Sequence, residues 1–366
     1  MRIKSVNSAR PRLRRRTSAM VIVAVLLAIL NISKLYGRLI HIHEEPHRKH
    51  YTVIASEENP MYSFFVPLTA MVWERYIGFT PIVFLIDEDS TKDGAPGVAP
   101  ADAVASGRLF PVIEEFLRVQ RLGIVRHLKP NASLPANGQV LSQTSRLMAS
   151  LLPELEANAY LLTSDVDLWP LAPTPYWTSE AQQSQRNVSG QDIALYNALC
   201  CGHDILAGVH YREYPMSCIG MSVKTWHQVI GIKPLSSWAS TAQVQDAVVQ
   251  RTNSLLSRHL GYGTPNPLQL PEKGGLTRWY YDQILVSYLL ALPGDHTGRL
   301  LEIPRDTVSD RMDRIAWPTY IFKESLSKYV DAHLLRPGYS DDNWPSLRRL
   351  LALLLCAEDM VAENGK

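Results

Sequence analysis

The stretch Tyr160-Leu-Leu-Thr-Ser-Asp-Val-Asp-Leu-Trp-Pro170 decides how this chain is interpreted, because an apolar run typical of a buried strand leads into two acids. Side chains alternate along an extended chain, so Asp165 and Asp167 are expected on the same side of it. Paired carboxylates there are costly unless a cation or hydrogen bonds compensate them. Oxygen ligands suit Mg²⁺ or Mn²⁺, which commonly join protein carboxylates to substrate phosphates. The motif therefore predicts a divalent metal that holds a diphosphate, with a solvated two-acid turn as the alternative.

The amino terminus predicts a membrane anchor. Several arginines within residues 1–16 precede an uncharged stretch at 17–33. At about 1.5 Å per residue this stretch spans roughly 25 Å, near the lower limit for a bilayer crossing. By the positive-inside rule residues 1–16 form a cytoplasmic tail, and the chain from Lys34 onward is lumenal. A cleaved signal peptide is the alternative, although the end of the apolar run offers no small-x-small cleavage pattern.

Sequons and cysteines agree with a chain that lies in the lumen. Asn131 and Asn187 each open an Asn-x-Ser sequon in a polar, turn-rich segment. Cys200, Cys201 and Cys218 are close enough in sequence for one disulfide, in which either of the first two pairs with Cys218, and buried thiols are the alternative. The formal net charge of +2 comes largely from the basic tail and indicates no nucleic-acid surface.

Alternating strand and helix patterns predict an α/β domain with a mostly parallel sheet and helices on both faces. After a stem at 34–50, we expect a nucleotide-sugar-binding half at 51–171, an acceptor-binding half at 172–345, and a carboxyl-terminal helix and tail at 346–366. The expected strands are 51–56, 81–87, 123–128, 159–162, 192–195 and 217–223. The expected helices are 64–76, 110–120, 142–156, 279–290 and 345–356.

Polar residues at strand ends are expected to gather at one edge of this sheet. Ligands of open parallel sheets bind outside the carboxyl ends of the strands. Ser56 and Glu57 follow the first expected strand and Asp87 follows the second, as Asp165 follows the strand at 159–162. Each could be a turn-forming residue alone, but their joint placement favours a shared donor-binding edge.

The segment Ser145-Arg-Leu-Met-Ala-Ser-Leu-Leu-Pro-Glu-Leu-Glu together with the Asp-x-Asp stretch resembles the corresponding part of glycogenin-like, retaining glycosyltransferases. With the anchor, the chain resembles a type II membrane glycosyltransferase of the GT-A fold. The fold-level resemblance covers about 51–340, and only 142–171 and 279–285 are motif-specific. It implies sugar transfer from a nucleoside-diphosphate donor to a glycan, glycoprotein or glycolipid acceptor in the Golgi or endoplasmic reticulum lumen. The Leu-Pro-Glu-Leu stretch favours retention of configuration over inversion.

The resemblance also implies how a metal is held. Asp165 and Asp167 match the acids that hold Mn²⁺, or Mg²⁺, on the donor diphosphate. A late histidine often completes the metal shell in this family. His333 is the best-placed match and His296 a distant second.

Further roles follow from the same resemblance. Arg146 would face the diphosphate, and Asp87 would lie near the nucleoside. Asp282 and Gln283, in the first turns of the helix expected at 279–290, match an Asp-Gln pair near the transferred sugar. Asp282 could stabilise the oxocarbenium-like sugar or remove a proton from the acceptor hydroxyl. An acid at this position also simply complements a helix dipole.

Two other classes of protein share parts of this pattern. Phosphatases of the haloacid dehalogenase type also carry Asp-x-Asp after an apolar strand, but their motif has Thr or Val where this chain has Trp169. Their motif also usually opens the domain. A membrane-anchored, non-catalytic binding protein with the GT-A fold is the second alternative, and sugar-nucleotide hydrolysis separates it from an enzyme.

Overall fold

The computed structural model describes residues 49–87, 108–130, 138–172, 192–232, 240–261, 280–303, 311–315, 317–318, 321 and 326–355. The expected anchor at 17–33 and both sequons, Asn131 and Asn187, lie outside these residues. Within the described ranges, none of the helices has the length and apolar character needed to cross a bilayer.

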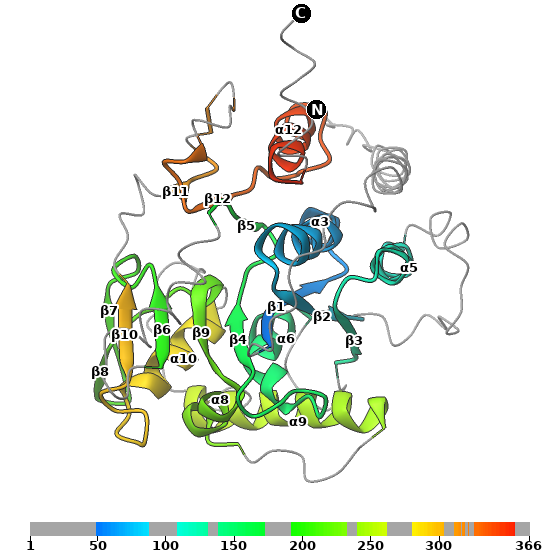
Figure 1. The fold of residues 1–366 in the computed structure, drawn as a ribbon. Coiled ribbons are helices and arrows are strands. Elements are labelled where there is room, and N and C mark those ends of the chain that lie inside the picture. The colour runs from blue at the N-terminus through cyan, green and yellow to red at the C-terminus, as the bar shows by residue number, and fades with distance from the viewer. Residues whose placement is uncertain are drawn as a thin grey trace, which may run out of the picture.

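A seven-stranded sheet forms the centre of the protein (Figure 1). The strands in spatial order are β10 (Leu300–Ile303), β6 (Ile193–Tyr196), β9 (Ile219–Ser222), β4 (Tyr160–Thr163), β1 (His50–Glu57), β2 (Thr80–Ile86) and β3 (Ile124–Leu128). Neighbouring strands are parallel except at β9, which runs antiparallel to both β4 and β6. The expected α/β class with a mostly parallel sheet is therefore confirmed.

Helices cover both faces of this sheet (Figure 1). One face carries α6 (Gly138–Ser145), the 3₁₀ turn η2 (Arg146–Leu151), α8 (Val223–Ile230), α9 (Thr241–Leu260) and α10 (Tyr281–Ala291). The other carries α3 (Val66–Val72), the π-helical turn η1 (Trp73–Ile77), α5 (Phe110–Gln120) and α12 (Trp344–Leu355), with α2 (Pro60–Ser63) after β1. Strand β1 illustrates the division, because Val53 packs into the first core and Ile54 into the second.

A small second sheet brings the late part of the chain to the acid pair. It has the order β11 (Arg311–Met312), β12 (Asp331–His333) and β5 (Leu168–Pro170). β12 is antiparallel to β5 and places His333 opposite Leu168, directly after the second acid. The amide of Leu334 donates to the Asp167 carbonyl oxygen at 2.8 Å. A separate hairpin, β7 (His203–Leu206) with β8 (Val209–Arg212), follows β6.

Two expected boundaries differ from the observed ones for local reasons. The helix expected at 142–156 begins earlier, at Gly138, and ends in η2. Leu152 is extended (φ −63°, ψ 123°) because the following residue, Pro153, disfavours helical backbone before it. His50, expected in the polar stem, is instead the buried first residue of β1.

Candidate functional site

The acid pair lies on a turn between two strands. β4 ends before Asp165 and β5 begins after Asp167, so the two acids do not share the extended chain expected from the sequence. Helix α3 fixes this turn, because Thr69 Oγ1 donates to the Val166 carbonyl oxygen at 2.5 Å. The turn directs the two carboxylates toward different partners.

A cavity of about 790 Å³ opens at this edge of the sheet, a size typical of small-molecule pockets. The carboxyl ends of β1, β4 and β6 meet here with the amino end of β9, because β9 alone runs in the opposite direction. Eight of the residues predicted from sequence line it: Ser56, Glu57, Arg146, Asp165, Asp167, Asp282, Gln283 and His333.

Asp87, the remaining predicted donor-binding residue, is not among the lining residues. It follows β2 and faces the neighbouring strand β3. Its Oδ2 lies 3.2 Å from Nδ1 of His127. This hydrogen bond raises the pKa of His127 against the opposing effect of burial. In this structure Asp87 therefore contacts His127 on β3 and does not line the cavity.

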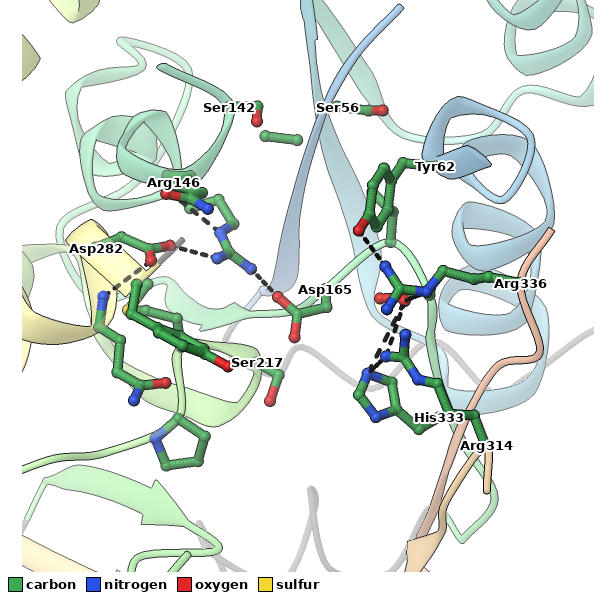
Figure 2. Close-up of a pocket in the computed structure, with 18 of the residues that line it drawn as sticks. Ser56, Tyr62, Ser142, Arg146, Asp165, Ser217, Asp282, Arg314, His333 and Arg336 are labelled. Atoms are coloured by element: carbon green, nitrogen blue, oxygen red, sulfur yellow. Dashed lines mark hydrogen bonds and ion pairs between the residues drawn. The ribbon is translucent and has the colours of Figure 1, made fainter. Parts of the chain in front are cut away.

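Arg146 lies between two carboxylates (Figure 2). Its Nη1 donates to Asp165 Oδ1 at 2.5 Å and to the Ser164 carbonyl oxygen at 2.9 Å, and its Nη2 donates to Asp282 Oδ2. The arginine side chain is only 8% exposed. Burial alone lowers the pKa of the guanidinium, but the two adjacent carboxylates outweigh it and raise that pKa. Arg146 therefore remains charged and holds both acids in place.

The two acids on Arg146 are in different environments. The Asp165 side chain is 38% exposed to the cavity, whereas that of Asp282 is 3% exposed. Burial raises the pKa of Asp282, and the shared guanidinium offsets this only in part. Partial burial also opposes charge on Asp165, but Arg146 outweighs it and lowers the pKa of that carboxyl. Asp165 is thus the charged and accessible acid of this group.

Asp167 lies among three bases, Arg314, Arg336 and His333, which Figure 2 shows on the side of the cavity opposite Arg146. Its Oδ2 is 3.2 Å from Arg314 Nη2, 3.4 Å from Arg336 Nε and 3.9 Å from His333 Nε2. Burial raises the pKa of Asp167, against the lowering effect of His333 and Arg336. Asp313 adds a second acid to this wall, with Oδ2 3.6 Å from the other ring nitrogen of His333.

The sequence reasoning missed both arginines of this wall. The Arg336 guanidinium carbon lies 4.9 Å from the centre of the Tyr62 ring, and its Nη1 donates to the Tyr62 hydroxyl. Arg336 follows His333 by three residues. Its closeness in sequence to a predicted metal ligand was therefore a signal that it lies near the site. Arg314 lies in a stretch with no strand or helix pattern, and only the folded chain brings it to Asp167.

Helix α10 lies on the same side of the cavity as Arg146. Its first turn carries Asp282 and Gln283, as expected. Gln283 Nε2 donates to Glu213 Oε2 at 3.0 Å, and the Gln283 amide donates to Asp282 Oδ1 at 2.8 Å. The dipole of α10 favours an acid here. The contact with Arg146 shows in addition that Asp282 is part of the cavity's charged network.

The cysteines pair differently from the expectation. A disulfide joins the adjacent residues Cys200 and Cys201, both of which line the cavity. Cys218 is buried in a separate apolar cluster with Tyr160 and Tyr196. The turn after β6 thus brings neighbouring sulfurs together, while Cys218 belongs to the core.

The predicted metal ligands fit a divalent ion by chemistry but are not gathered into a closed site. Within the described residues, no three His, Cys, Asp or Glu side chains cluster closely enough to hold a metal. Asp165, Asp167 and His333 nevertheless line one cavity and offer two carboxylates and an imidazole. Mg²⁺ is commonly bound through one or two carboxylates, with substrate phosphates completing its shell. These residues therefore fit an ion that arrives with a diphosphate.

Comparisons with known proteins give distant structural likenesses. No protein-family model and no curated protein matches the chain. The chain is similar to the bifunctional glycosyltransferase WbbM in its apo form (8% identity, 85% of this chain and 51% of that one, TM-score 0.40), so it spans about half of WbbM. It is also similar to mouse xyloside xylosyltransferase 1 (8% identity, 78% and 97% covered, TM-score 0.32). A third likeness is to a glycosyltransferase involved in glycosylation of the PBCV-1 major capsid (10% identity, 77% and 93% covered, TM-score 0.29). Such distant likenesses define no family for this chain.

Proposed function

We propose that this protein is a glycosyltransferase that moves a sugar from a nucleoside-diphosphate donor to a glycan, glycoprotein or glycolipid acceptor. One observation carries the proposal. A single cavity at the carboxyl edge of a mostly parallel sheet joins an Asp-x-Asp pair to the buried Arg146, to the half-buried Arg314 and Arg336, and to the first turn of α10. Ligands bind at this edge in open α/β sheets, and the charged groups match an anionic, cation-bound substrate.

Different residues of the cavity would bind different parts of the donor. Ser56 and Glu57 at the end of β1 would face the nucleoside. Arg314 and Arg336 would contact the diphosphate, because guanidinium groups match phosphate geometry. Asp165, which is charged and accessible, would hold Mn²⁺ or Mg²⁺ together with Asp167 and His333. When bound, such an ion neutralises negative charge on the leaving diphosphate.

The chain's own groups account for the remaining chemistry. Positive charge develops on the anomeric carbon as the diphosphate leaves. The negative charge of Asp165 would lie beside that carbon and stabilise it in the transition state, and Asp282 would add to this effect in its charged form. Arg146 holds both acids at fixed positions, so little reorganisation is needed. The Leu-Pro-Glu-Leu resemblance supports retention of configuration as the stereochemical outcome.

The proposal is tested by donor hydrolysis. The purified full-length protein is incubated with a panel of UDP- and GDP-sugars, with and without Mn²⁺, and release of the nucleoside diphosphate is measured. We expect hydrolysis that requires the metal and disappears in Asp165→Ala and Asp167→Ala, while both variants still fold, as a cooperative unfolding transition shows. Binding of donors without any turnover would instead favour a non-catalytic binding protein, and a phospho-aspartate at Asp165 would favour a phosphatase.

The proposed location is the Golgi or endoplasmic reticulum membrane, with the folded domain in the lumen. It rests on the arginine tail and the apolar stretch at 17–33. Mass spectrometry of the protein from a secretory cell should find the arginine tail retained and glycans on Asn131 and Asn187. A mature chain that begins after Ser33 would contradict the anchor.

A further inference from the structure

Asn197 has an unused hydrogen-bonding group at the cavity. It follows β6 directly, lines the cavity and is 2% exposed. Its φ of 59° lies in the left-handed region, which asparagine adopts more readily than most residues. Its side-chain oxygen Oδ1 is buried and has no hydrogen-bond partner among the described residues. A buried acceptor without a partner is uncommon and calls for a ligand or water that supplies a donor.

The Cys200–Cys201 disulfide lies beside this asparagine. The Cys200 amide donates to the Asn197 carbonyl oxygen at 3.1 Å, so the bridged pair and Asn197 belong to one turn. A bond between adjacent cysteines closes a small covalent ring with the peptide link. The turn therefore presents a rigid surface of polarisable, apolar sulfur to the cavity.

Pro215 and Met216 extend the apolar part of this wall. Both line the cavity, just before the strand β9 that lies between β4 and β6. The wall thus offers a buried hydrogen-bond acceptor next to rigid apolar groups. A sugar ring has the complementary surfaces, because its hydroxyls donate hydrogen bonds and its C–H face packs against apolar atoms.

The position of this wall distinguishes the possible occupants. Asn197 and Asp165 lie at the same edge of the sheet, two strands apart, which corresponds to roughly 10 Å. A diphosphate has no hydrogen to donate to Asn197, and Arg314 and Arg336 attract it to the opposite wall. The burial of Asn197, which is 2% exposed, favours the sugar already attached to the donor, because an acceptor that binds after the donor meets the exposed part of the lining, such as Ile315 at 92%.

We infer that Asn197, the Cys200–Cys201 disulfide, Pro215 and Met216 form the subsite for the glycosyl group of the nucleoside-diphosphate donor. This inference rests on the proposed function and deepens it. Asn197 would select a sugar hydroxyl, and the disulfide would support the ring face. These groups therefore determine sugar specificity but do not bind the nucleotide.

The test compares two ligands that differ only in the sugar. Calorimetry measures binding of UDP and UDP-glucose, and of GDP and GDP-mannose, to the full-length protein with Mn²⁺. In Asn197→Gly, which keeps the left-handed backbone, sugar-nucleotide affinity should fall about tenfold, as expected for a lost buried hydrogen bond, with diphosphate affinity unchanged. The matched control is Asn253→Ala, because Asn253 is also buried and its Oδ1 also has no partner in the part of the chain that the structure describes, but it lies in α9 and does not line the cavity. It should leave both affinities unchanged.

A second variant tests the disulfide. Cys200→Ser combined with Cys201→Ser should weaken sugar-nucleotide binding several-fold and leave diphosphate binding intact. Unchanged sugar-nucleotide binding in both the asparagine and the cysteine variants, or a change confined to the KM for the acceptor, would overturn the subsite assignment while leaving the proposed function standing. A wild-type protein that binds neither the diphosphates nor their sugars would overturn the proposed function itself.

Discussion

Both sides of the cavity carry acidic and basic side chains, but acids outnumber bases on one side and bases outnumber acids on the other. On one side, Arg146 lies between Asp165 and Asp282. On the other, Asp167 lies among Arg314, Arg336 and His333. One base is shared by two acids in the first group, whereas in the second Asp167 is shared by several bases and Asp313 contacts only His333 among them.

This contrast separates two kinds of ligand. The acid-rich group attracts cations, either a metal or the positive charge that develops on a sugar. The base-rich group attracts the oxygens of a phosphate, once a ligand competes with Asp167 for the guanidinium groups. A nucleoside-diphosphate sugar needs both kinds of surface at neighbouring points. The contrast also implies unequal sensitivity to mutation, because Arg146 has no substitute whereas Arg314 and Arg336 partly replace each other.

The largest expected effect is on stability in the Arg146 group. Arg146→Met leaves two neighbouring carboxylates without their shared guanidinium, and breaking a buried pair in this way costs about 3–5 kcal/mol. Arg314→Met should cost only about 1 kcal/mol, because Asp167 keeps its other partners. Urea unfolding of both variants measures the difference. Arg146→Met combined with Asp282→Leu should recover part of the loss, and equal costs for the two arginines would contradict the comparison.

The next effect is on catalysis. Asp165→Asn keeps the shape of the side chain but removes its charge, and donor hydrolysis should fall about 100- to 1,000-fold, as when one preorganised electrostatic group is lost. The matched control is Asp192→Asn, since Asp192 is also paired with an arginine, Arg299, but lies outside the cavity. Steady-state hydrolysis assays compare the two. Similar losses in both variants would show that the effect comes from stability rather than from the site.

Much of the fold was predictable because its signals are local. The strand at β2 and the helix α5 follow apolar patterns that neighbouring residues define, and both lie within a residue of their expected ranges. The direction of β9 was not predictable, because pairing with β4 and β6 depends on distant segments rather than on the residues of the strand. For the same reason, the turn that carries Asp165 and Asp167 was not predictable, because it depends on the contact with α3.

The site was predictable to the extent that its residues follow strands or occupy a helix start. Asp165 and Asp282 were identified in that way and share Arg146, as a common cavity requires. Asp87 follows a strand equally well but pairs with His127 on β3, so position at a strand end is not sufficient. Arg314 lies in no pattern at all, and its role depends on the small second sheet formed around β12.

The base-rich group should control affinity for the diphosphate. Arg336→Ala removes one charged hydrogen-bond donor, and loss of such a contact to a phosphate corresponds to about a 10- to 100-fold weaker affinity. Arg336→Lys should recover it only in part, because lysine cannot donate through a planar fork. Calorimetry with UDP and GDP measures both variants against Arg299→Ala, an arginine paired with Asp192 away from the cavity. Unchanged affinity for UDP and GDP in Arg336→Ala would show that the diphosphate does not bind at the base-rich group.

The smallest effect extends the comparison to an acid outside the cavity. Glu74 lies in η1, its Oε2 has no hydrogen-bond partner within the described residues, and burial raises its pKa to about 7 against the effect of Arg75. The folded protein therefore binds this proton more tightly than the unfolded chain, so stability falls as the pH rises from about 4.5 through about 7. Glu74→Gln should be more stable than the wild type by about 1–3 kcal/mol at pH 8 and equal to it near pH 4.5. Urea unfolding at both pH values measures this. A difference that does not change with pH would show that folding leaves the pKa of Glu74 unshifted, and a variant less stable than the wild type at pH 8 would show that Glu74 is stabilised in its charged form, as Asp165 is by Arg146.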